Sequence, residues 1–365
     1  MSNEAGQELT LDEDQSVASH RQRNRNVRRV LFICASITVL TTLAIFWVLF
    51  NEATHFFFDS RASGILSNLL FGDGVSQRIS LWEFFFGGER WDPTHSINPG
   101  YWVVPLVWGT LMITVGAALI SIPIGTLTAL YLSEYASEGV RKYLKPGLEV
   151  LAGVPTIVYG FFAVSFITPW LIQPIAEVFG QQTRSTNAIA GAVVVGIMTI
   201  PIVASISEDA MNSVPDELRN GAYALGATKY QVSTRIVLPA AVSGIFAAYI
   251  LAISRAVGET MAVVLAAGFT PQVTLNPFDE IQTMTAYMVD AARGEAVIGS
   301  IRYQSLFAIG FALFLMTLAL NLLNDYVKRR YREEYQLAPI RNRMSTFWTA
   351  VTSASNTSKA GSSGD

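Results

Sequence analysis

The chain lacks most of the side-chain sets that enzymes and metal proteins need. Cys34 is the single cysteine, so the chain can form no internal disulfide and no site with several thiolate ligands. The three histidines, His20, His55 and His95, are scattered without the spacing of metal ligands. No nucleophile–base set is visible, and no GxxxxGKS/T phosphate-binding loop occurs. The sequence therefore predicts a protein without catalytic residues, metal ligands or a bound cofactor.

Charge is also scarce. Only 15% of the residues are charged, against roughly a quarter in soluble domains, and the net charge of −3 gives no basis for binding nucleic acid. Hydrophobic residues make up 51% of the chain. They gather in runs that each reach the roughly 20 residues needed to cross a bilayer. The runs lie at 30–50, 103–132, 148–172, 186–207, 237–268 and 303–326. They predict an all-α membrane protein with six transmembrane helices.

The positions of the basic residues predict the orientation. With the N-terminus in the cytoplasm, 18 of the 25 lysines and arginines fall on the cytoplasmic side, six fall outside, and Arg255 lies within a span. Lysine and arginine are enriched in the cytoplasmic loops of membrane proteins, so this bias favours both termini in the cytoplasm. The first apolar run follows a long polar segment and is not followed by a small-residue cleavage site, which favours an uncleaved anchor over a signal peptide.

Four segments follow from this pattern. Residues 1–26 are polar and lack apolar periodicity, which predicts a disordered cytoplasmic tail. Residues 27–102 carry the first transmembrane helix and an aromatic-rich outside segment, residues 103–327 form the main transmembrane domain, and residues 328–365 form a cytoplasmic C-terminal tail. Within the main domain, the apolar residues of 278–292 recur at helical spacing and predict a helix lying on the membrane surface.

The connector between the fourth and fifth runs is polar but carries several helix signals. Ser213 and Asp216 have the spacing of a capping box, which predicts a short helix that ends at Gly226. Thr228 is expected to cap a second helix leading into the fifth span. The prediction is a helix–turn–helix elbow on the cytoplasmic face, and the alternative is an orderly loop without a partner.

Two opposite charges lie inside the fifth run. Arg255 and Glu259 are four residues apart and therefore share a helix face. One interpretation is an internal ion pair that only holds the bundle together, although such pairs add little to stability. The favoured interpretation is an anion pathway, in which the planar guanidinium binds phosphate-like oxygens and Glu259 orients it. Glu208 and Asp209, by contrast, are expected to be solvated residues at the end of the fourth span.

The connector resembles the cytoplasmic signature of the transmembrane subunits of ABC importers, which reads EAA, three residues, Gly, nine residues and I-x-L-P. The matching residues are Asn220, Gly221, Ala222, Gly226, Ile236, Leu238 and Pro239. The spacing agrees in full, while Asn220 stands where the family favours Glu and Gly221 where it favours Ala. The resemblance implies a type I-like importer permease in which residues 208–239 form a coupling helix seated on an ATPase.

Longer strings resemble the phosphate importers, and within them the PstC-type permease. They include LWEFFFGGERWDP (81–93), KPGLEVLAGVPTIVYGFF (145–162), PIVASISEDAMNSVP (201–215) and SRAVGETMAV (254–263). In that family the Arg and Glu of span five, here Arg255 and Glu259, are linked with phosphate transport. The resemblance implies a permease of an ATP-driven importer in a bacterial or archaeal plasma (inner) membrane. Its implied partners are a second, PstA-like permease, a PstB-like ATPase dimer that binds the ATP, and a PstS-like phosphate-binding protein.

Two other functions stay open. A permease for another oxyanion would use the same arginine, because sulfate and molybdate also bind forks of N–H donors. A secondary transporter or channel subunit is expected to show an inverted repeat or interrupted helices, neither of which is clear in the sequence.

Overall fold

The computed structural model describes residues 2–59, 76–77, 79–88, 90–93, 99–293, 300–323 and 326. Its backbone separates into two compact units, Met1–Arg78 and Ile79–Asp365.

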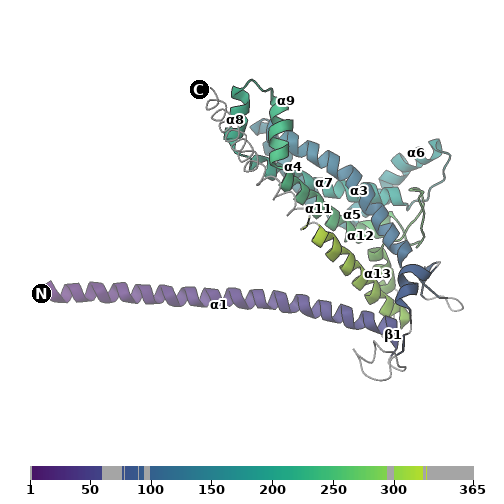
Figure 1. Ribbon diagram of the computed structural model, residues 1–365, viewed down its shortest axis with the longest axis horizontal. Helices are drawn as coiled ribbons and strands as arrows, with labels where there is room; N and C mark the ends of the chain where they lie inside the picture. The colour runs from purple at the N-terminus through teal and green to yellow at the C-terminus, as the bar shows by residue number, and fades with distance from the viewer. Residues whose placement is uncertain are drawn as a thin grey trace, which may run out of the picture. The chain divides into compact units, whose positions relative to one another are not determined.

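The first unit consists mainly of one long helix. α1 (Ser2–Phe57) is continuous in Figure 1 and is followed by β1 (Phe58–Asp59), which pairs antiparallel with β2 (Ser76–Gln77). Its apolar part is long enough to cross a membrane and contains the first predicted span. Residues 2–26 are helical where the sequence predicts disorder. No proline precedes Pro93, so the backbone meets no obligatory helix breaker there.

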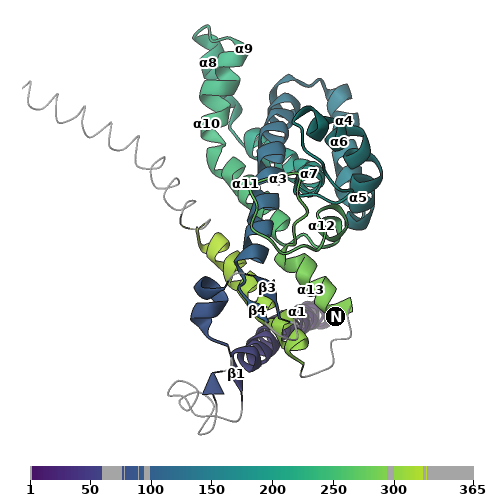
Figure 2. The ribbon, with the colours of Figure 1, turned by 90° about the vertical axis from the view of Figure 1, so that its right-hand side faces the viewer.

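The second unit is a helical bundle built around α7 (Ala188–Asn212). Of the candidate membrane spans among the described residues, α7 has the largest buried share, 61%. α3 (Val104–Leu130) and α11 (Val242–Val257) pack against α7 (Figures 1 and 2). α5 (Thr156–Phe162) and α12 (Met261–Ala266) pack against each other and complete the core around α7.

The other described elements of this unit are short segments or lie toward its ends. They are η1 (Glu83–Gly87), β3 (Trp91–Asp92) paired antiparallel with β4 (Gly100–Tyr101), η2 (Tyr131–Tyr135), α4 (Glu138–Gly153), η3 (Ala163–Ile172), α6 (Gln173–Val178), α8 (Asp216–Ala224), α9 (Lys229–Val232), η4 (Ser233–Val237), α10 (Leu238–Ala240), α13 (Met284–Arg293) and a last helix, Ile301–Leu323. The η segments are π-helical.

Small residues allow the closest helix contact in the bundle, between α3 and α7. A Cβ added at Gly116 would lie 2.7 Å from the Cβ of Ala192, and one added at Gly125 would lie 2.6 Å from the Cβ of Val203. Atoms at those separations clash, so both positions require glycine for the helices to approach this closely. The packing role that the sequence predicts for the glycines of α3 is therefore confirmed at these two sites.

The six predicted spans are confirmed with changed boundaries. Among the described residues, five helices are long and apolar enough to cross a membrane, and one bent pair makes a sixth. The third span covers Thr156–Val178 instead of 148–172. The reason is that α4 is a separate helix with no buried residue, and Pro155 lies between it and α5.

The fifth span is interrupted and does not form the single run 237–268. A bend of 69° separates Lys229–Ala240 from α11. α11 then ends at Gly258, and α12 begins only at Met261, so Glu259 lies in a break between two helices. The sequence does not reveal this break, because hydropathy is similar on both sides of it and carries no information on backbone direction.

The predicted surface helix at 278–292 is also different. A helix does form, as α13, but the apolar side chains of Phe278, Ile281, Met284 and Tyr287 are buried inside the protein. The hydroxyl groups of Tyr287 and Ser305 are hydrogen-bonded at 2.6 Å, which ties α13 to the last helix. This segment therefore belongs to the bundle instead of lying on a membrane surface.

Candidate functional site

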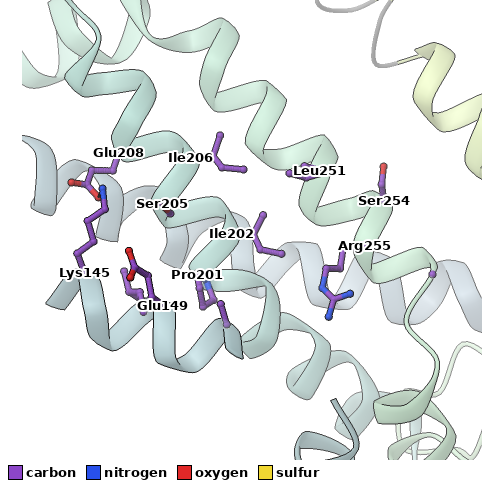
Figure 3. Close-up of a pocket in the computed structure, with 13 residues that line it drawn as sticks. Lys145, Glu149, Pro201, Ile202, Ser205, Ile206, Glu208, Leu251, Ser254 and Arg255 are labelled. Carbon is purple, nitrogen blue, oxygen red and sulfur yellow. Dashed lines mark ion pairs between the residues drawn. The ribbon is translucent and has the colours of Figure 1, made fainter. Parts of the chain in front are cut away.

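A cavity of about 640 Å³ lies between α4, α7 and α11, and four charged side chains line it. Arg255 comes from the last turn of α11, Lys145 and Glu149 from α4, and Glu208 from α7 (Figure 3). Most of the other lining residues are apolar, among them Leu148, Ala152, Pro201, Ile202, Ile206 and Leu251. An ion entering the cavity would meet few charged groups, and those few would decide which ions it accepts.

Arg255 offers a guanidinium that its neighbours hold only loosely. Its Nη2 lies 3.8 Å from Oε2 of Glu259 and 3.8 Å from Sδ of Met198, and both distances are long. The side chain is 45% exposed. An unpaired arginine in hydrocarbon costs roughly 3 to 15 kcal/mol, so the free donors of Arg255 require water or an anion in the cavity.

Glu259 is held from the opposite side of the helix break. Its side chain is 4% exposed, and Oε1 accepts a hydrogen bond at 3.3 Å from the backbone N–H of Ala262, in the first turn of α12. Its carbonyl accepts a hydrogen bond at 2.7 Å from Oγ1 of Thr285, on α13. The structure therefore brings the predicted pair Arg255 and Glu259 together. It does so across a helix end and not along one continuous helix face.

Glu208 is buried and is not the solvated end residue that the sequence predicts. None of its side chain is exposed, and its Oε1 lies 2.5 Å from Nη2 of Arg141 while its Oε2 lies 3.4 Å from Nζ of Lys145. The two cations come from α4, so Glu208 ties α4 to α7. A carboxylate without exposed surface is tolerated because these two cations compensate its charge.

Asp209 is exposed as predicted, yet it also contributes to this cluster. Its Oδ1 accepts a hydrogen bond at 3.3 Å from Nζ of Lys145. Burial alone lowers the pKa of Lys145, but the hydrogen bond to Asp209 and the attraction of Glu208 outweigh burial and raise the pKa. Sequence reasoning missed the two α4 cations. The available signal was the spacing of Arg141 and Lys145, which places both on one face of an amphipathic helix.

The elbow forms largely as predicted. Gly226 follows α8 with a φ of +82°, a left-handed conformation that favours glycine. Thr228 caps α9: its Oγ1 accepts a hydrogen bond from the N–H of Gln231 at 3.4 Å, and Oε1 of Gln231 accepts one from the N–H of Thr228 at 2.8 Å. The capping box predicted at Ser213 is wrong, because that hydroxyl donates to a carbonyl of α7 at 2.7 Å.

The residues predicted to couple to an ATPase fall into two groups. Asn220, Gly221 and Gly226 are exposed on the elbow. The partly buried group at its base is Ala222, Ile236, Leu238 and Pro239, and Ala222 and Leu238 pack against a buried cluster that includes Val214 and Val237. The first group is available to a partner, while the second joins the elbow to the bundle.

The elbow also exposes large apolar side chains that sequence reasoning did not single out. Leu218 is 50% exposed, Tyr230 is 69% exposed and Leu225 is 90% exposed. Apolar side chains that gather on one exposed tip indicate a surface for protein contact.

Arg219 anchors the elbow to the end of α3. Its Nε and Nη2 donate to Oε1 of Glu134 at 3.2 and 3.1 Å, and its side chain is only 14% exposed. In the second arm of the elbow, Nζ of Lys229 lies 5.0 Å from the ring centroid of Tyr135. Both arms therefore contact the same two residues of η2, a link that the sequence did not reveal.

Comparison with known proteins places these features in a family. The family described as "Binding-protein-dependent transport system inner membrane component" matches residues 121–333. The chain is similar to the probable ABC transporter permease protein YqgH of Bacillus subtilis, with 35% identity over 67% of this chain and 77% of that protein.

Two further relatives carry the name of a phosphate transport system. The chain is similar to the permease protein PstC of Mesorhizobium japonicum, with 28% identity over 74% of this chain and 88% of that protein. It is also similar to the permease protein PstA 1 of Mycobacterium tuberculosis, with 32% identity over 71% of this chain and 73% of that protein. Because the family match covers more than half of the chain, this protein belongs to the binding-protein-dependent transport system inner membrane component family.

Proposed function

We propose that this chain is one permease subunit of an ATP-driven phosphate importer and forms half of the translocation pathway. The observation that carries the proposal is Arg255, a half-exposed guanidinium facing a largely apolar cavity between helices. Relatives that are named phosphate permeases support phosphate as the substrate. The ATP is bound by a partner, because this chain contains no phosphate-binding loop of the GxxxxGKS/T type.

Arg255 compensates the charge of phosphate during its passage. The guanidinium presents paired N–H donors that match two phosphate oxygens. Its contact with Glu259 is long, at 3.8 Å, so an incoming anion competes with a weak partner. Glu259 keeps the N–H of Ala262 as a second partner when Arg255 turns away. A site of this kind binds weakly enough to release its anion, which transport requires.

The elbow is the contact with the ATPase dimer. Its exposed apolar side chains provide a surface for that contact, and its N-cap and glycine turn give it a fixed shape. This assignment puts the elbow and both termini in the cytoplasm, in agreement with the distribution of lysine and arginine. A second permease completes the pathway, and a binding protein delivers phosphate from the other side.

The runner-up functions differ in their predicted cargo or energy source. A permease for another oxyanion would use Arg255 in the same way. A secondary transporter gains some support from the helix break at Gly258, since interrupted helices are common in that class. It leaves the apolar surface of the elbow without a partner, and for that reason we favour the ATP-driven importer.

Uptake of labelled phosphate tests the proposal. The chain is expressed with the second permease, ATPase and binding protein of its own importer, in cells that lack other high-affinity phosphate uptake. Arg255→Ala should reduce ATP-dependent uptake to background, and Arg255→Lys should restore part of it. Arg184→Ala is the matched control, because Arg184 is 80% exposed and lies outside the cavity.

The outcomes separate the candidate functions. Phosphate uptake that excess unlabelled sulfate or molybdate abolishes would favour another oxyanion. Uptake that continues after ATP is depleted would favour a secondary transporter. Uptake unchanged by Arg255→Ala would remove Arg255 from the pathway and leave the pair as a packing contact.

A further inference from the structure

The cavity that contains Arg255 holds a second cation, Lys145. Nζ of Lys145 lies 3.4 Å from Oε2 of Glu208 and 3.3 Å from Oδ1 of Asp209, and the side chain is 33% exposed. Both distances are long for hydrogen bonds between charged groups. In Figure 3, Lys145 and Arg255 lie at separate places along the same cavity, which α7 borders between them.

Glu208 does not depend on Lys145 for charge compensation. Its Oε1 makes a much shorter ion pair with Arg141, at 2.5 Å. If Lys145 turns toward the cavity, the buried carboxylate still has a cation. The arrangement repeats that of Arg255 and Glu259, where the carboxylate also keeps a second partner. In both cases a buried carboxylate positions a cation without requiring it.

We propose that Lys145 is a second oxyanion station, which receives the transported anion after Arg255. This inference rests on the proposed function. An ammonium is a compact, strongly hydrated charge without the fork of arginine, so it binds an oxyanion less tightly. The carboxylates of Glu149 and Glu208 line the same cavity and further weaken anion binding there. A weak site near the elbow end suits release, and the cavity has room for an anion with its water.

Cysteine chemistry tests this station directly. Cys34 is the only cysteine, so a Cys34→Ser parent carries no competing thiol. In that parent, Lys145→Cys should lower phosphate uptake by about fivefold, the effect of losing one partly exposed charge pair. Aminoethyl methanethiosulfonate adds an ammonium to the new thiol, and treating the purified complex with it before reconstitution should restore uptake. The sulfonatoethyl reagent adds a negative charge and should not.

Protection by phosphate separates a binding role from a purely structural one. Inorganic phosphate at millimolar concentration should slow modification of the thiol at position 145. The matched control is Lys142→Cys on the same helix, which lies outside this cavity, and phosphate should not affect its modification. If Lys145→Cys fails to assemble, Lys145→Gln keeps a donor for Glu208 and should lower uptake with normal assembly.

Three results would overturn the inference. They are equal rescue by both reagents, modification at position 145 that phosphate does not slow, and full uptake by Lys145→Gln. The failure of the proposed function looks different, because the Cys34→Ser parent would then take up no phosphate at all. Uptake by the parent without protection at position 145 refutes only the second station.

Discussion

Replacing Arg219 by alanine is expected to open the elbow locally while the bundle stays folded. Arg219 and Glu134 have side chains that are 14% and 5% exposed. Besides its two bonds to Glu134, Arg219 donates to the carbonyl of Met211 at 2.8 Å and to that of Val214 at 2.5 Å. Arg219→Ala therefore takes a donor from three acceptors at the junction of α7 and α8.

The expected cost lies between the values for surface and buried ion pairs. Removing one partner of a buried pair costs about 3–5 kcal/mol, and exposed pairs contribute about 0–1 kcal/mol. Because Glu134 keeps a hydrogen bond from Ser133 at 3.3 Å, its charge is not left without a donor. We therefore expect about 2–3 kcal/mol. At 1.4 kcal/mol per factor of ten, the open population rises roughly 30- to 150-fold.

Hydrogen exchange measures this opening directly. The amides of residues 214–228 should exchange faster in Arg219→Ala by that factor, while those of α7 should keep the wild-type rate. Asp216→Asn is the matched control, because Asp216 also pairs with Arg219 at 3.1 Å but is 85% exposed. It should change the exchange rate less than threefold. Equal effects of the two substitutions, or a uniform increase across the bundle, would refute the anchoring role.

Three other predictions concern the elbow and α13. Leu225→Asp should weaken co-purification of the ATPase, whereas Leu275→Asp, at a leucine that is 82% exposed outside the elbow, should not. Gly226→Ala should destabilise the elbow by about 1 kcal/mol in hydrogen exchange, because φ is +82° there. Burial raises the pKa of Tyr287 to about 12 from 10.0, so its contribution to stability is complete below pH 10 and lost as pH rises toward 12. Tyr287→Phe should flatten that part of the melting profile.

Local chemistry accounts for what could be predicted from the sequence. The spans follow from runs of apolar residues, and the turn and second cap of the elbow follow from Gly226 and Thr228, whose roles depend on neighbours within a few residues. The cap at Ser213 was wrong for a related reason. A hydroxyl at that position has two nearby choices, and the structure uses the carbonyl of α7.

Long-range contacts account for what could not be predicted. Glu208 looks like a helix-end residue until Arg141, 67 positions earlier in the chain, lies against it. The break after Gly258 is stabilised by Thr285 from α13 and by the N–H of Ala262, and neither contact leaves a trace in hydropathy. The charges of the cavity were visible individually, but their partners were set by tertiary packing.

The helix break gives the proposed importer a physical route from the elbow to the anion site. The arm Lys229–Ala240 continues through a bend of 69° into α11, and α11 carries Arg255 in its last turn. Glu259 lies beyond the break and is held by α12 and α13, so it does not belong to that arm. A displacement of the arm therefore changes the position of Arg255 relative to Glu259.

The distance between the two side chains makes this arrangement sensitive. At 3.8 Å, the contact between Arg255 and Glu259 is near the limit of an ion pair, so a small shift of α11 decides whether the guanidinium faces the carboxylate or the cavity. Coupling between distant sites requires an element with two arrangements that both sites bias. A rigid helix through residues 237–268 would move both side chains together and keep their separation constant. The interruption that the sequence did not reveal is thus what allows movement at the elbow to change the affinity of Arg255 for an anion.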